Sequence, residues 1–235
     1  MKKFIIEEEF WSLFPEAKIG IIVCHGINNN IEQEDKYLDM ISEAQKEATK
    51  YLPNSEFSSN AVVKVWRDAY KKFKTKKGAR SSIEAMLKRA ANGNGVGAIN
   101  PLVDIYNAAS LKFALPCGGE DISTFDGDIK LTRATGEEEF RTFGSDENQP
   151  PYEGEVIYKD NSGAICRCWN WRESTRTMLT EKTKDAFLVI ESIDEKRVKD
   201  FEEALQFLSK EVKENLGGTS EIVILDINNK EMEIK

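Results

Sequence analysis

The chain has 235 residues, of which 40% are hydrophobic and 31% are charged. This balance is typical of a globular protein, and the length is sufficient for one domain with a substantial core. No apolar run approaches the ~20 residues of a membrane helix, and the apolar run after Lys2 and Lys3 is too short for a signal peptide. We therefore expect a single domain over residues 1–235, located in the cytoplasm and without a membrane partner.

The formal net charge of −8 opposes long-range attraction to a polyanion. A nucleic acid would therefore need a local basic patch. The segment 64–89 supplies one, because it holds ten Lys and Arg residues with only Asp68 and Glu84 against them. Either this segment is a solvated helix pair with a basic loop, or Lys76, Lys77 and Arg80 contact phosphate.

Four cysteines are scattered along the chain, and the pair Cys166 and Cys168 has no second pair or histidine cluster to complete a metal site. We expect free thiols in a reducing compartment, and no metal or cofactor. His25 is the only histidine and hence the only candidate for an imidazole base. Its position at a predicted strand end favours a structural role.

The first half of the chain is predicted to be mainly helical. The β-branched run Lys18–Cys24 predicts a buried strand. Apolar residues at three- and four-residue spacing then predict helices over about 31–52, 59–73, 81–91 and 101–113. Asn30 is the predicted N-cap of the first of these helices, and Ser81 or Ser82 that of the third.

After Pro116 the pattern changes to strands. Apolar and polar residues alternate over 129–134, 155–158 and 164–168, with a hairpin turn at 160–163. The run 187–190 predicts a buried strand, followed by an amphipathic helix over 198–212 and a last strand over 222–225. The order lacks regular βαβ alternation and therefore predicts an α+β fold.

Four motifs add information through their order, namely Trp66-Arg-Asp-Ala-Tyr70, Leu115-Pro-Cys-Gly-Gly-Glu-Asp121, Gly154-Glu-Val-Ile-Tyr158 and Trp169-Asn-Trp-Arg-Glu173. Over about residues 60–193 they resemble the stand-alone B3/B4-domain proteins. The stretch 101–190 also resembles the B3/B4 editing domain of the bacterial phenylalanyl-tRNA synthetase β subunit. The resemblance implies one mixed α+β domain, with helices packed on a largely antiparallel sheet.

The sequence departs from the synthetase pattern at three positions. Tyr106 stands in place of a threonine, and Gly118 in place of a pocket histidine. Glu173 lies about two residues from the glutamate of a late Gly-Gly-Glu segment. A synthetase-like reaction therefore does not follow from the resemblance alone.

The resemblance and the residue chemistry together predict a pocket between the Asn107 helix, a turn at Gly118 and Gly119, and a strand at 169–173. The two glycines could expose backbone N–H groups to a ligand or simply form a tight turn. Glu120, Asp121 or Glu173 could bind a substrate ammonium group. Asn107 and Asn170 could donate hydrogen bonds, although Asn107 could instead cap backbone on its helix.

Trp169 and Trp171 would lie on one side of the predicted strand, where two indoles suit stacking against an aromatic side chain or a nucleobase; core packing is the alternative. Arg172 and Arg80 could clamp a phosphate or carboxylate, or could form surface ion pairs.

Hydrolysis of an aminoacyl ester needs a positioned water and stabilisation of the developing oxyanion. The catalytic candidates are Glu173 and Asn107. The substrate-binding candidates are Tyr106, Gly118, Gly119, Glu120, Trp169, Asn170 and Trp171, and the RNA-binding candidates are Lys76, Lys77, Arg80 and Arg172.

The leading hypothesis is a tRNA-editing-like domain that recognises aminoacyl-tRNA and hydrolyses mischarged tRNA in trans. Two alternatives stay open: a non-catalytic module that binds RNA or an aromatic amino acid, and an enzyme that acts on a small metabolite.

Overall fold

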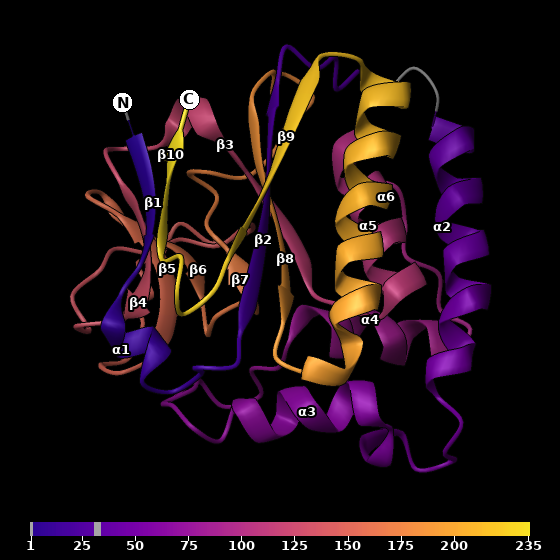
Figure 1. Ribbon diagram of the computed structural model, residues 1–235, viewed down its shortest axis with the longest axis horizontal. Coiled ribbons are helices and arrows are strands. Elements are labelled where there is room, and N and C mark those ends of the chain that lie inside the picture. The colour runs from indigo at the N-terminus through magenta and orange to yellow at the C-terminus, as the bar shows by residue number, and fades with distance from the viewer. Residues whose placement is uncertain (1, 31–33) are drawn as a thin grey trace.

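Two β-sheets form the centre of the protein (Figure 1), for which a computed structural model describes residues 2–30 and 34–235. The four-stranded sheet has the order β3 (Cys117–Asp121), β8 (Ala186–Ser192), β2 (Lys18–His25) and β9 (Thr219–Leu225). All of its neighbouring strands are antiparallel. Strand β3 therefore lies at one edge of this sheet.

The second sheet has six strands and is mixed. Its order is β10 (Glu231–Ile234), β1 (Lys2–Ile6), β4 (Ile129–Arg133), β5 (Val156–Asp160), β6 (Gly163–Arg167) and β7 (Arg172–Glu173). Strands β1 and β4 are parallel, and the other pairs are antiparallel. The sheet therefore combines the first and last strands of the chain, β1 and β10, with four strands from its middle.

The helices gather on one face of the four-stranded sheet, and the six-stranded sheet lies against the other face (Figure 1). On the helical side are α2 (Glu34–Ala48), α5 (Pro101–Phe113) and α6 (Val198–Leu216), while α3 (Ala61–Ala69) and α4 (Ser82–Ala91) lie near one end of the sheet. The short helix α1 (Glu8–Trp11) follows β1.

Successive side chains of β2 point to opposite faces of the four-stranded sheet, so this strand contributes to the core on both sides of the sheet. Ile19, Ile21 and Val23 are buried among residues of the six-stranded sheet and α1. Ile22 and Cys24 point the other way and pack with α5 and α6. Because both faces are covered, the strand is apolar at nearly every position, as the sequence suggested.

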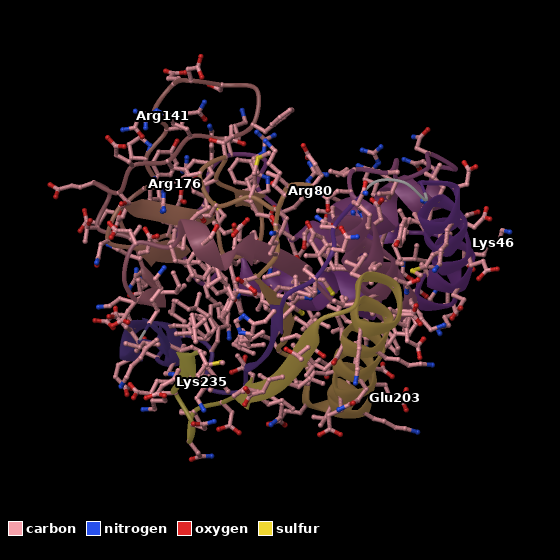
Figure 2. All side chains as sticks on the ribbon, turned by 90° about the horizontal axis from the view of Figure 1, so that it is seen from above. Lys46, Arg80, Arg141, Arg176, Glu203 and Lys235 are labelled. Carbon is pink, nitrogen blue, oxygen red and sulfur yellow. The ribbon has the colours of Figure 1, made fainter. Side chains whose placement is uncertain are left out.

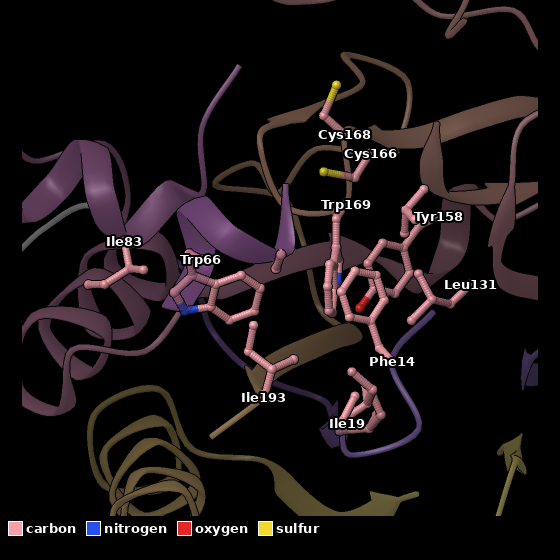
Figure 3. Packing of buried hydrophobic residues seen from close by; sticks show 14 of the residues in the cluster. Phe14, Ile19, Trp66, Ile83, Leu131, Tyr158, Cys166, Cys168, Trp169 and Ile193 are labelled. Carbon is pink, nitrogen blue, oxygen red and sulfur yellow. The ribbon is translucent and has the colours of Figure 1, made fainter. Parts of the chain in front are cut away.

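An aromatic cluster closes one end of the core (Figure 3). The indole of Trp169 is fully buried, with its ring centroid 5.0 Å from Phe10, 4.6 Å from Phe14 and 5.0 Å from Trp66. Two segments far apart in the sequence, residues 10–14 and the helix α3 with Trp66, are thereby packed onto the Trp169 side chain. Buried aromatic pairs of this kind contribute about 0.5–1.5 kcal/mol each beyond the area they bury.

The predicted α+β class is confirmed, and the structure divides the strands between two sheets. The helices predicted over 81–91 and 101–113 match α4 and α5, and the other predicted helices overlap α2, α3 and α6. The predicted hairpin turn joins β5 to β6. The predicted cap Asn30 and helix start at residue 31 concern a helix whose first described residue is Glu34, and residues 31–33 lie outside the described part of the chain.

Two local predictions were wrong. Gly118 and Gly119 lie inside β3 rather than in a turn, and only the last two residues of 169–173 form a strand, β7. Ser81 occupies the N-cap position of α4, but neither its hydroxyl nor that of Ser82 makes a capping hydrogen bond. The Ser82 N–H instead donates to the backbone oxygen of Asn170 at 3.2 Å. Strands β1 and β10 and helix α1 were not predicted.

Substitution of Gly20 by Ala should destabilise the fold. A Cβ atom on Gly20 would lie 2.6 Å from the Leu205 methyl carbons and 2.9 Å from the Phe201 ring, and both side chains are fully buried on α6. Overpacking of this kind costs about 1–3 kcal/mol. Urea unfolding should show this loss, whereas Gly95→Ala, where the new methyl group meets nothing within 4 Å, should change stability by less than about 0.5 kcal/mol. Equal stabilities of the two variants would contradict the packing described for β2 and α6.

Candidate functional site

A cavity of about 770 Å³ lies where α4, α5, β3, β6 and β7 meet. Its volume is within the range of small-molecule sites in proteins. All of the predicted catalytic and substrate-binding residues line it: Tyr106, Asn107, Gly118, Gly119, Glu120, Trp169, Asn170, Trp171 and Glu173. Arg172 lines it as well. The structure thus brings together three segments, of which the first and the last are more than sixty residues apart in the sequence.

A turn with a strained backbone at Cys168 and Trp169 places the last of these segments, residues 169–173, at the cavity. Cys168 and Trp169 have φ angles of 46° and 66°, in the left-handed region that bulky side chains rarely adopt. The Trp169 N–H donates to the Val156 carbonyl at 2.6 Å, and the Trp171 N–H donates to the Arg167 carbonyl at 3.2 Å. These bonds and the burial of the Trp169 indole hold the turn, so that Asn170 to Glu173 face the cavity.

Of the two alternatives for the tryptophans, the structure shows core packing for Trp169 and no stacking wall shared with Trp171. Trp169 belongs to the aromatic core. The turn at Cys168 and Trp169 interrupts the extended backbone, so Trp169 and Trp171 do not share one side of a strand. Trp171 is only partly buried, and the guanidinium of the exposed Arg172 lies 4.9 Å from its ring centroid. Trp171 and Arg172 therefore form a cationic and aromatic edge of the cavity.

Three glutamates line the same cavity. Burial, reinforced by the nearby Glu173, raises the pKa of Glu120 well above its usual range. Burial raises the pKa of Glu173 to about 7, against an opposing hydrogen bond from the Gly119 backbone. Burial also raises the pKa of Glu191 to about 7, although bonds from Tyr158 and Asn170 favour its ionised form. The cavity therefore holds three carboxyl groups whose pKa values are raised by burial.

Glu191 was not predicted as a site residue. Its side chain is 1% exposed and accepts hydrogen bonds from the Tyr158 hydroxyl, at 2.5 Å, and from the Asn170 amide. The Asn170 oxygen in turn accepts from the Tyr70 hydroxyl at 3.0 Å. Because its amide is bonded on both sides, Asn170 positions Glu191. The signal in the sequence was a glutamate at the end of an otherwise apolar strand.

Asn107 and Tyr106 have polar groups available to a ligand. Asn107 is 9% exposed and Tyr106 is 7% exposed, and both line the cavity from α5. Within residues 2–30 and 34–235, neither side chain makes a hydrogen bond. Asn107 therefore does not cap backbone, and its amide can donate to a bound molecule.

The glycines of β3 serve close packing rather than ligand binding through N–H groups. The Asp121 N–H points away from β8 and donates to the Thr177 carbonyl at 2.9 Å. By the alternation of an antiparallel pair, the Gly119 N–H points the same way, toward Glu173, and the Gly118 N–H points toward β8. A Cβ atom on Gly119 would lie 2.6 Å from Leu188 and 2.9 Å from Leu179. Because Gly119 has no side chain, Leu188 and Leu179 can pack directly against its backbone.

Some candidates lie outside the cavity. Asp121 accepts hydrogen bonds from the backbone of Ser123 at 2.9 Å and from the Thr183 hydroxyl at 2.8 Å, so its carboxylate is structural. His25 pairs with Asp185 at 3.1 Å beside a separate recess near β9. The described cysteines are free and buried, and burial raises the pKa of Cys24 and Cys168 to about 12, which makes these thiols unreactive.

Much of the basic segment is already paired. Lys64 and Lys71 bind Asp68, Arg67 binds Glu84, and Lys72 lies 3.6 Å from Glu16. Lys76 donates to the amide oxygen of Gln149 at 3.0 Å. For Lys77 and Arg80, no ion pair forms within the described residues.

The loop that carries Lys76, Lys77 and Arg80 leads into Ser82, which lines the cavity. Figure 2 shows Arg80 between the strand-rich half, marked by Arg141 and Arg176, and the helical half, marked by Lys46. Arg89 of α4 lines the cavity and is exposed. Cations thus lie beside the cavity and carboxyl groups lie within it.

The structure is an α+β fold with an internal cavity that is lined by carboxyl groups and bordered by basic residues. The family model of the B3/4 domain matches residues 65–216, and the chain belongs to this family. Among solved structures, an N-terminal fragment of the phenylalanyl-tRNA synthetase β-subunit from Pyrococcus horikoshii is similar, with a TM-score of 0.49 and 13% identity. The match covers 92% of this chain and 49% of that fragment. No curated protein matches the chain.

The resemblance stated from the motifs is therefore confirmed at the level of the family. The match begins close to the residue 60 expected from the motifs and extends past residue 193 to the end of α6. In the described part of the chain, no helix is long and apolar enough to cross a membrane.

The substitution Glu173→Gln should flatten the pH dependence of stability. Burial raises the pKa of Glu173 from 4.5 to about 7, so the folded chain keeps this proton to a higher pH than the unfolded chain does. The free energy of unfolding therefore falls as the pH rises through this interval, and the variant should lose this part of the fall. Urea unfolding at about pH 5 and about pH 8 measures the difference. Glu202→Gln, on the exposed face of α6, should keep the wild-type dependence; an unchanged slope in Glu173→Gln would show that this carboxyl is solvated in the folded chain.

Proposed function

We propose that the protein is a cytoplasmic, tRNA-editing-like domain that binds the aminoacyl end of tRNA in this cavity and hydrolyses the ester of mischarged tRNA in trans. The observation that carries the proposal is the separation of charge at one site. Carboxyl groups and unbonded polar atoms lie inside the cavity, and basic side chains lie beside it. An aminoacyl-tRNA end has the matching arrangement, with a cationic amino acid at the tip and phosphates behind it. Membership of the B3/4 family agrees with this proposal.

The cavity offers groups for ester hydrolysis. Glu173, with a pKa of about 7, can accept a proton from water near neutral pH. The Asn107 amide has no partner in the described structure and can donate to the oxyanion that develops on the ester carbonyl. The apolar walls, which include Ile129, Ile165 and Val189, can hold the amino acid side chain.

The mouth of the cavity suits a nucleotide. Phe143 and Ile99 line the cavity and yet are 81% and 66% exposed, so their apolar surface is available to a base. Arg172 and Arg89 lie at the same border and can contact phosphate. The loop of Lys76, Lys77 and Arg80 extends the basic surface toward the rest of the RNA.

One observation favours the non-catalytic alternative. The chain has a single histidine, which lies outside the cavity, and the N–H groups of Gly118 and Gly119 have other partners. Oxyanion stabilisation would then depend on Asn107 and Tyr106 alone. A module that binds RNA or an aromatic amino acid without turnover would need no such groups.

Purified protein at catalytic concentration should release labelled amino acid from a subset of mischarged tRNAs, and Glu173→Gln should lower the rate by a factor of about 100 or more, because a positioned base contributes about 10²–10⁴-fold. Glu202→Gln serves as the matched control and should keep the wild-type rate. Release by the variant at the wild-type rate would remove Glu173 from the mechanism. RNA binding without release from any charged tRNA would support the non-catalytic module instead.

Replacement of Lys76, Lys77 and Arg80 by Ala should weaken RNA binding. Loss of three phosphate contacts should reduce the slope of log K against log salt by about 2, since each contact to a single strand contributes about 0.7. Fluorescence anisotropy over a salt series measures both effects. The control replaces three exposed lysines of α6, namely Lys199, Lys210 and Lys213, and changes the net charge equally. Equal losses in both variants would mean that net charge, rather than this loop, governs binding.

A further inference from the structure

We infer that the buried end of the cavity binds a protonated amine between the carboxyl groups of Glu120 and Glu173, and that the ligand is a primary amine carried on an apolar body. The inference rests on the proposed function, in which this amine belongs to the aminoacyl group, and it names the residues that select it.

One carboxyl oxygen of Glu120 lacks a hydrogen-bond partner in the described structure. The side chain is 7% exposed and lines the cavity from β3. The nearby Thr177 hydroxyl favours its ionised form, but the Oε2 atom has no partner within hydrogen-bond distance in the described structure. A buried polar atom without a partner costs about 1–3 kcal/mol, more when the group is charged. A ligand that donates hydrogen bonds here would remove this cost.

Glu173 faces the same space from β7. A Cβ atom built on Gly118 would lie 3.3 Å from the Glu173 Oε1 atom, so the glycine leaves room for this carboxyl group over β3. The Gly119 N–H points toward Glu173 and lowers the pKa of this carboxyl. The two carboxyl groups are close enough that Glu173 raises the pKa of Glu120.

Among the described side chains, no cation pairs with either carboxyl group. Arg176 is the cation that acts on Glu120, but its guanidinium is bound to both oxygens of Asp160, at 2.9 and 2.6 Å. The protein therefore leaves the pair without a counter-charge, and an ammonium group from the ligand would supply it.

The surroundings define the rest of the ligand. Phe125, Trp171 and Val189 line the cavity, and aromatic faces attract a cation while apolar walls hold a hydrocarbon. Asp121, the third acidic candidate, is excluded because both of its oxygens accept hydrogen bonds from the protein. An amine attached to an apolar or aromatic group fits both features of the site.

Isothermal titration calorimetry with stable amides tests the inference. L-Phenylalaninamide should bind the wild-type protein at least about tenfold more tightly than 3-phenylpropanamide, which has the same body without the amine. Glu120→Gln should lose this preference while keeping the affinity for 3-phenylpropanamide, and Glu202→Gln should keep the preference. Equal affinities of the two amides for the wild-type protein would overturn the inference, even if Glu120→Gln fails to fold. A preference that persists in folded Glu120→Gln would also overturn it.

A second set of ligands identifies which amine is bound. L-Norleucinamide has only the α-amine, 6-aminohexanamide has only a terminal amine, and hexanamide has neither. Tighter binding of either amine than of hexanamide supports the inference and assigns the site to the α-amino group or to a side-chain amine. Equal binding of all three overturns it.

Failure here and failure of the proposed function give different results. A protein that releases amino acids from tRNA but shows no amine preference overturns this inference alone. A protein that prefers the amines but neither binds nor hydrolyses charged tRNA overturns the proposed function and retains the amine site.

Discussion

The burial of Trp169 is the constraint on which the core and the cavity both depend. Its backbone and that of Cys168 adopt a left-handed conformation that is costly for bulky residues, and the turn persists because the indole fills the space between Phe10, Phe14 and Trp66. The residues that follow this turn, from Asn170 to Glu173, line the cavity. Asn170 reaches Glu191 there, and the residues up to Glu173 form the wall opposite β3. The aromatic core therefore sets the position of the candidate site.

The distribution of charge around the cavity is unusual for an acidic protein. Three carboxyl groups are buried or partly buried inside it without an ion-paired cation in the described structure, and arginines lie at its border. Burial of a carboxyl group is costly unless it is protonated or paired, and the raised pKa values reflect that cost. Natural proteins retain such groups mainly where a ligand or a reaction uses them. The arrangement suits a ligand with a cationic inner end and an anionic outer end.

The sequence predicted the helices and most strands, because their apolar residues repeat with the right period. It failed where long-range packing decides the structure. Strands β1 and β10 are short and pair with each other across the whole length of the chain, so no local pattern marks them. Gly118 and Gly119 suggested a turn, but they are extended and exist because Leu188 and Glu173 occupy the space of their side chains. The site residues were found through the motifs, whereas Glu191 was missed because it ends an apolar strand and reaches the cavity only in the folded sheet.

The proposed hydrolysis and the inferred amine site are chemically linked through Glu173. Burial raises the pKa of this carboxyl to about 7, so near neutral pH a substantial share of it is protonated and cannot accept a proton from water. An ammonium group bound beside it favours the ionised form, because an opposite charge at close range lowers the pKa of a carboxyl. Under both proposals, the substrate amine would favour the ionised Glu173, which accepts a proton from the water that attacks the ester. A ligand without the amine would leave a larger share of Glu173 protonated, so recognition of the amino group and activation of water would be coupled.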